Sequence, residues 1–156
     1  MTLWLASLEK LKTRNFLVDK GIIDIQQALC PFCNLVVESN SHILFMCTFA
    51  WGTWMEILKC WGICGVLHDS CGNFIIEWFG LMRRRRWKKL WSLILGCVIW
   101  SLWYLRNKAK FERCDLNFHN FICTLKVRIG IWAKELLGFT DGSPHGFILP
   151  SDTFRL

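Results

Sequence analysis

The chain has 156 residues, of which 53% are hydrophobic and 15% aromatic. Such a composition excludes an intrinsically disordered chain, and three prolines and eleven glycines exclude a collagen-like or proline-rich one. The net charge of +7 is concentrated, because residues 83–113 hold ten of the nineteen basic residues and one acidic residue. A local basic block of this kind favours an anionic partner.

The N-terminal third predicts two helical pieces followed by a turn. Apolar residues recur every three or four positions over residues 2–20, which predicts an amphipathic helix. Thr13 is expected to interrupt this helix by capping a new turn, and Gly21 to end it. Residues 28–42 contain a polar Glu38-Ser39-Asn40-Ser41 segment, and a tight loop or short hairpin fits them better than a helix.

The remainder of the chain also predicts helices. A helix is expected from Thr48 to about Trp61, with an apolar stripe of Trp51, Trp54, Ile57, Leu58 and Trp61. Further helices are expected at 74–82, 90–105 and 118–137, and the tail from residue 138 looks irregular. No strand alternation is sustained anywhere, so the fold class is expected to be mostly α.

Nine cysteines are many for this length. The first eight residues lack the basic start of a secretory signal, and Glu9 and Lys10 interrupt any apolar run. We therefore expect a nuclear or cytoplasmic protein, not a secreted one. In such a reducing compartment, cysteines are more often metal ligands or buried apolar residues than disulfide partners.

Four residues have the spacing of a metal site, Cys30-x2-Cys33-x8-His42-x4-Cys47. Three thiolates and one imidazole are a standard ligand set for a closed, structural zinc ion. Two thiols separated by two residues can reach one ion from a tight turn. The alternative is three buried cysteines and a hydrogen-bonded histidine, which the spacing alone does not exclude.

The same region resembles the zinc-binding segment that follows the reverse transcriptase in plant LINE-type (non-LTR) retrotransposons. Residues 11–17, followed by Gly21 and Ile22, are similar to that family's Leu-Pro-Thr-Arg-x-x-Leu…Gly-Ile lead-in, with Lys12 in place of the usual proline. Further matching landmarks are Cys30-Pro-Phe-Cys33, Glu38-Ser39, His42, Cys47, Trp51-x2-Trp54, Trp61 and the later Ile99-Trp100…Trp103-x2-Arg106-Asn107-x3-Phe111.

The resemblance implies a small helical domain with a zinc-stapled loop or short hairpin, bound to Zn through Cys30, Cys33, His42 and Cys47. It divides the chain into a zinc-binding-like domain at 1–113, a helix at 114–137 that packs on it, and the tail at 138–156. The chain has no Asp-Asp pair of the kind that holds two metal ions in a polymerase. We therefore expect no catalytic activity and no small-molecule substrate.

A second set of possible ligands is Cys60, Cys64, His68 and Cys71. The resemblance does not support a metal here, and Cys60 also fits the apolar stripe of the preceding helix. Unliganded thiols are the favoured interpretation of this set.

The basic run comprises Arg83, Arg84, Arg85, Arg86, Lys88 and Lys89, around Trp87. These six cations repel one another, and phosphate groups of RNA or DNA would relieve that repulsion without sequence specificity. Plain solvation and a nuclear import signal are the alternatives.

Residues 90–105 carry no charge and are flanked by Lys89 and Arg106. Sixteen helical residues span about 24 Å, less than the roughly 30 Å of bilayer hydrocarbon. A core helix is therefore favoured over a membrane helix. The sequence thus predicts a zinc-binding, nucleic-acid-associated accessory module derived from a retroelement reverse transcriptase. The alternatives are a small membrane-anchored protein with a helix at 90–105 and a decayed, non-functional fragment.

Overall fold

The computed structural model describes residues 11–60, 76–78, 80, 85–112 and 116–138. The expected fold class is confirmed, because these residues are mostly α-helical. Their β-structure is limited to one isolated antiparallel bridge between Leu29 and Val37. The helical pattern at residues 2–10 and the tail from residue 139 lie outside the described residues.

The first described helix, α2, spans Arg14–Asp19 and begins and ends where the sequence predicts. The Thr13 side chain accepts a hydrogen bond from the Phe16 amide at 3.5 Å, which caps the helix. Gly21 follows the helix at φ 66°, in the left-handed region. The Gly21 and Ile22 amides donate back into the last turn, as in a Schellman motif.

Helix α3 spans Thr48–Cys60 and confirms the expected helix there. Trp54, Ile57 and Leu58 are buried as the stripe predicts. The predicted stripe is wrong at Trp51, whose side chain is 41% exposed. A helix turns by about 100° per residue, which puts Trp51 at the edge of the face that Ala50 and Trp54 bury. Trp61 lies outside the described residues.

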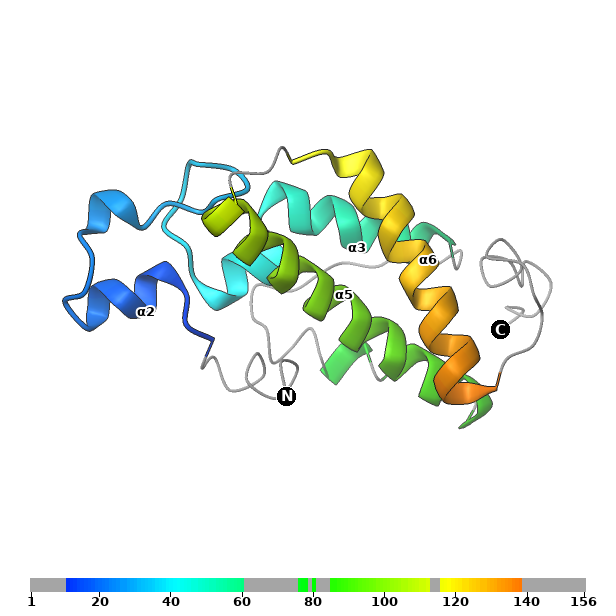
Figure 1. Ribbon diagram of the computed structural model, residues 1–156. Coiled ribbons are helices and arrows are strands. Elements are labelled where there is room, and N and C mark those ends of the chain that lie inside the picture. Colours follow the sequence, from blue (N-terminus) through cyan, green and yellow to red (C-terminus); the bar gives the residue numbers. More distant parts are fainter. Residues whose placement is uncertain (1–10, 61–75, 79, 81–84, 113–115, 139–156) are drawn as a thin grey trace.

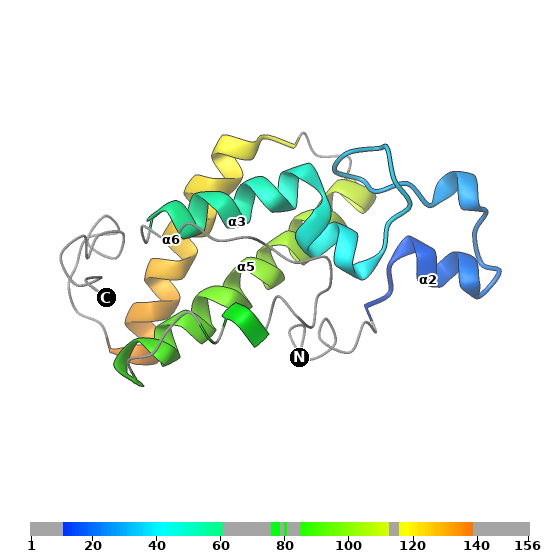
Figure 2. The same cartoon turned by 180° about the vertical axis from the view of Figure 1, so that it is seen from behind.

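Helix α5 is the centre of the fold (Figures 1 and 2) and spans Arg85–Glu112. It joins the end of the basic run, the uncharged run and the polar segment after it into one continuous helix. The uncharged run supplies the buried face, with Leu90, Trp91, Ile94, Leu95, Val98, Ile99 and Leu102 each at most 1% exposed. No helix in the described part of the chain is long and apolar enough to cross a membrane.

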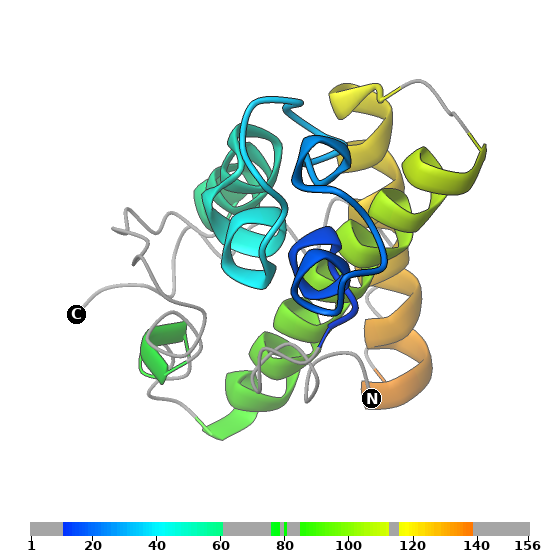
Figure 3. The same ribbon diagram turned by 90° about the vertical axis from the view of Figure 1, so that its left-hand side faces the viewer.

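Helix α6 spans Phe118–Leu137, in agreement with the predicted range. The Asn117 side chain caps its start by accepting from the Asn120 amide at 2.9 Å. Gly138 ends it at φ 65°, a conformation that costs glycine little. The helix runs back along α5 in the opposite direction, as Figures 1 and 3 show. Helices α3 and α6 and the turn at His42–Met46 thus pack around α5.

Three tryptophan side chains pack together in the core. The Trp78 and Trp91 rings stack with centroids 4.2 Å apart. Each indole N–H donates to the other residue's backbone carbonyl, at 3.1 and 2.6 Å. Trp54 packs edge-on against Trp78 and donates to the Leu44 carbonyl at 2.7 Å. Indoles suit this core because they bury a large ring while their one polar atom stays hydrogen-bonded.

We predict that Leu95→Ala lowers the free energy of unfolding by about 2–5 kcal/mol, because it leaves a cavity in the buried face of α5. The matched control is Leu136→Ala on α6, whose side chain is 69% exposed and whose removal should change stability by about 0.5 kcal/mol at most. Chemical denaturation followed by tryptophan fluorescence measures both. Equal losses for the two variants would contradict the burial of α5.

Candidate metal centre

A tight turn presents the first two candidate ligands. The bridge between Leu29 and Val37 closes it, with the Cys30 amide donating to the Val36 carbonyl at 2.7 Å. Inside the turn the Asn34 amide donates to the Cys30 carbonyl at 2.9 Å. Asn34 adopts φ 55°, which asparagine tolerates better than most residues. The short hairpin expected here is therefore present in minimal form, and it directs both thiols to one side.

A π-helical turn, η2 (His42–Met46), presents the other two. It is closed by the Cys47 amide, which donates to the His42 carbonyl at 2.8 Å. In a regular α-helix, residues five apart lie about 140° apart around the axis and point away from each other. The wider π-turn lets His42 and Cys47 reach the same point despite their spacing.

The four ligand atoms converge. One atom from each of Cys30, Cys33, His42 and Cys47 lies within 4.8 Å of all the others. The Cys30 and Cys47 sulfurs are 3.8 Å apart, and the Cys33 sulfur is 3.4 Å from Nε2 of His42. Zinc–sulfur bonds of about 2.3 Å at tetrahedral angles give sulfur atoms about 3.8 Å apart, and zinc–nitrogen bonds give about 3.6 Å between sulfur and nitrogen. The donor set and its spacing therefore fit a tetrahedral zinc ion.

Hydrogen bonds prepare the thiols for a cation. The pKa of Cys47 is lowered to about 5, chiefly because the Cys30 thiol donates a hydrogen bond to its sulfur. A hydrogen bond from the Phe49 amide and the charge of His42 lower this pKa further. The pKa of Cys30 is raised, because its thiol donates a hydrogen bond to Cys47 and because it is buried. The Phe32 amide donates to the Cys30 sulfur at 3.4 Å. A metal ion that binds both sulfurs displaces the proton that the two thiols share.

A buried ion pair attaches this segment to helix α5. Glu38 lies between Cys33 and His42 in the sequence, and it is fully buried. Its two carboxylate oxygens accept hydrogen bonds from Nε of Arg106 at 3.1 and 3.0 Å. Nη2 of Arg106 completes a forked contact with the same carboxylate. The guanidinium also lies 4.8 Å from the Trp103 ring and donates to the Asn107 side chain.

The same carboxylate holds the start of α2. It accepts from the Arg14 amide at 2.9 Å, an amide in the first turn that no helix carbonyl can reach. The Arg14 side chain donates to the Leu29 carbonyl at 2.8 Å. Glu38 therefore joins α2, the turn that bears the cysteines, and α5. The sequence placed Glu38 and Arg106 among the landmarks of the resemblance, but no local pattern pairs residues so far apart.

The other sequence-predicted residues are placed only in part. Cys60 ends α3 half-buried, and the rest of its set, Cys64, His68 and Cys71, lies outside the described residues. Cys97 is buried within α5, where burial raises the pKa of its thiol to about 11. Such a thiol is protonated and unreactive at neutral pH, as expected of a core residue.

The basic run is described at one end only. Lys88 and Lys89 are exposed in the first turns of α5. Arg83, Arg84 and the side chains of Arg85 and Arg86 lie outside the part of the chain that the structure describes.

The fold and the site define a helical module with a Cys3His cluster suited to one metal ion. Residues 1–54 match the family model described as zinc-binding in reverse transcriptase. This match includes all four candidate ligands and Glu38, and it stops before Arg106. No curated protein and no solved structure matches the chain. The comparison therefore supports the zinc-binding family for the N-terminal third, the part that contains the cluster.

We predict that the purified chain holds one zinc ion and that Cys33→Ser or His42→Ala removes most of it. Each change deletes one of four ligands from a site whose apparent binding energy is on the order of 10 kcal/mol. Elemental analysis after dialysis gives the stoichiometry. The matched controls are Cys123→Ser and His119→Ala on α6, which change the same residue types outside the cluster. Full zinc retention in a Cys30→Ser/Cys33→Ser double variant would refute the site.

We also predict that Arg106→Met destabilises the fold by about 3–5 kcal/mol, because it leaves the Glu38 carboxylate buried without its counter-charge. Adding Glu38→Gln should recover part of this loss, since a neutral amide is cheaper to bury than an unpaired charge. Urea denaturation of the two single variants and the double variant measures the coupling. Strictly additive losses would show that the two side chains do not interact.

Proposed function

We propose that the chain is a zinc-stapled accessory module derived from a retroelement reverse transcriptase, which associates with nucleic acid and catalyses no reaction. The observation that carries the proposal is the convergence of Cys30, Cys33, His42 and Cys47 within 4.8 Å, in a segment that matches the reverse-transcriptase zinc-binding family. The plant and LINE-type assignment is part of the proposal and rests on the landmarks in the sequence.

The ligand set supports a structural role for the metal. A catalytic zinc ion keeps one coordination position for water or substrate, whereas four protein ligands fill a tetrahedral site. Cys30 and Cys47 are fully buried, and Phe32 and Phe49 pack with their rings 4.9 Å apart beside them. When bound there, the metal would fix the turn and η2 against each other. The hydrogen bonds between these four side chains are weak ones that involve sulfur.

The start of α5 supports the contact with nucleic acid. The positive end of a helix dipole lies at its N-terminus, where cations are unfavourable and anions are stabilised. The first turn of α5 contains no acidic residue, and the exposed Lys88 and Lys89 follow it directly. Phosphate groups bound at this end would offset both the dipole and the mutual repulsion of the basic run.

We predict that replacing Arg83, Arg84, Arg85 and Arg86 by Gln weakens binding to every RNA and DNA sequence alike. Phosphate contacts hold nucleic acid without reading its sequence. If four of the six cations of the basic run engage a single strand, that run should contribute about −3 to the slope of log K against log salt, at about −0.7 per phosphate, and the variant should show a flatter slope than the parent chain. Fluorescence anisotropy over a salt series measures this slope.

The control variant loses the same charge at exposed lysines elsewhere: Lys12, Lys20, Lys59 and Lys134, each replaced by Gln. It should keep most of the slope, and both variants should keep their zinc. Unchanged affinity of the Arg83–Arg86 variant at low salt would exclude this block as a nucleic-acid contact. A nuclear import signal would then be the better interpretation.

A further inference from the structure

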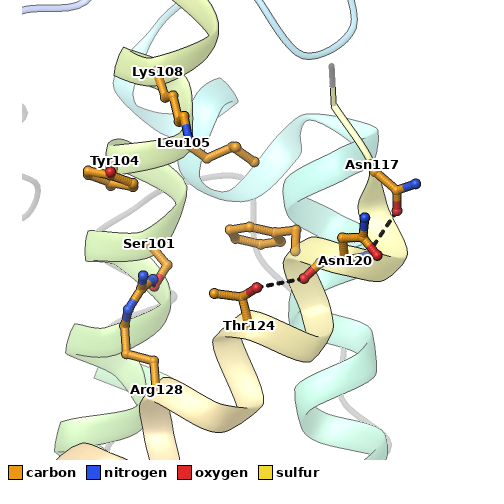
Figure 4. A pocket seen from close by; sticks show the side chains of 9 residues that line it. Ser101, Tyr104, Leu105, Lys108, Asn117, Asn120, Thr124 and Arg128 are labelled. Atoms are coloured by element: carbon orange, nitrogen blue, oxygen red, sulfur yellow. Dashed lines mark hydrogen bonds between the residues drawn. The ribbon is translucent and has the colours of Figure 1, made fainter. Parts of the chain in front are cut away.

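A cavity of about 270 Å³ opens between α5 and α6, far from the metal ligands in sequence (Figure 4). Ser101, Tyr104 and Lys108 line it from α5. Arg128 reaches across from α6 toward Ser101, with Asn120 further along the same helix, as Figure 4 shows. The volume is close to the roughly 300 Å³ at which small-molecule sites begin, so it suits a single small unit and not a large ligand.

The described lining of this cavity is cationic. None of its lining residues carries a carboxylate, whereas Lys108 and Arg128 carry positive charges. Arg128 is half-buried and makes no ion pair among the described residues. Lys108 has only an exposed pair with Glu112 at 3.8 Å, which is worth little in water. A half-buried guanidinium that has no ion-pair partner among the described residues favours an anion.

Arg128 is also held in place. Its Nη1 donates to the Ser101 hydroxyl at 2.8 Å, and its guanidinium lies 4.7 Å from the centre of the Trp100 ring. Among the described residues these contacts use one of its five N–H donors, which leaves others for a ligand. A side chain already held in one position loses little freedom when an anion binds, and this favours affinity.

An aromatic face lies beside the cations. Tyr104 lines the cavity, is 48% exposed, and stacks on Trp100 with the ring planes within 10° of parallel. A fixed, exposed ring next to positive charge is the combination with which proteins hold unpaired bases and their phosphates. The first turn of α6 contains no acidic residue that would oppose a phosphate near the helix N-terminus.

We propose that this cavity binds one nucleotide of a single-stranded nucleic acid, with phosphate groups of the strand on Arg128 and Lys108 and the base against Tyr104. The proposal rests on the proposed association with nucleic acid and adds a second contact to it. Lys108 lies twenty residues along α5 from Lys88, which is about 30 Å. A strand that contacted both the basic run and the cavity would have to span at least this distance.

The test is the affinity of the zinc-loaded full chain for a fluorescein-labelled oligouridylate of fourteen nucleotides. Lys108→Gln and Arg128→Gln should each weaken binding and flatten the salt slope by about 0.7. Lys126→Gln is the matched control, because it removes one charge from α6 outside the cavity lining. Lys108 is partly exposed and its replacement should leave the melting temperature unchanged, so its result stands even if Arg128→Gln folds poorly.

A second pair of variants tests the base contact. Tyr104→Leu removes the ring and should weaken binding about tenfold, whereas Tyr104→Phe keeps the stacking face and should bind like the parent. A hairpin duplex of equal length should not distinguish these variants, because its bases are paired. Inorganic phosphate and uridine monophosphate, added as competitors, separate a site for free phosphate from a site for a nucleotide.

The outcomes distinguish this proposal from the proposed function. If the Arg83–Arg86 variant loses affinity while the cavity variants all bind like Lys126→Gln, the cavity proposal is wrong and the association stands. If the parent binds no oligonucleotide at all, both are wrong. If inorganic phosphate competes through Arg128 but Tyr104→Leu binds like Tyr104→Phe, the cavity holds a phosphate alone and the nucleotide assignment fails.

Discussion

The carboxylate of Glu38 is the point on which the rest of the structure depends. It is fully buried, and it is paired with Arg106 from α5 and with the Arg14 amide from α2. A buried charge is tolerable only when its partners are complete, because removing it from water costs several kcal/mol. Each element must therefore take its native position before the carboxylate is satisfied. The backbone of Glu38 makes two further hydrogen bonds between these segments: its amide donates to the Ala28 carbonyl, and its carbonyl accepts from the Asn15 amide.

Residues in α5 show why one long helix is needed. Its start carries the cations Lys88 and Lys89, its middle packs into the core through residues such as Leu95, and its last turns carry Arg106. Because a helix is stiff, these three parts keep fixed distances from one another. The metal cluster is consequently held at a fixed distance from the exposed charges at the far end of the helix.

The elements that the sequence predicted are those with local signals. Thr13, Gly21, Asn117 and Gly138 mark helix ends through contacts within a few residues. The four candidate ligands could also be found, because chemistry restricts their types and spacing. The burial of Trp54 followed from helical periodicity, whereas the exposure of Trp51 depends on where α5 and η2 lie.

Other features leave no local trace. The π-turn at His42–Met46 depends on packing, since Ile43, Leu44 and Phe45 are buried by the rest of the chain. The continuity of α5 was hidden by its composition, which passes from basic to apolar and back to basic. The pairing of Glu38 with Arg106 joins residues 68 apart. The charges of the two residues are visible in the sequence, but their partners are not.

That separation has a consequence for the order in which the molecule assembles. The contact between Cys30 and Cys47 closes a loop of 17 residues, a quarter of the 68 that the ion pair must close. Each doubling of loop length raises the entropic cost of closing a loop by about 0.6 kcal/mol. Closing the longer loop therefore costs about 1.2 kcal/mol more than closing the shorter one. On the ribosome, moreover, all four cysteine and histidine ligands are made before the first residue of α5. The short loop can thus form first and hold the Glu38 carboxylate in its native position. Helix α5 then packs against a carboxylate that is already in place.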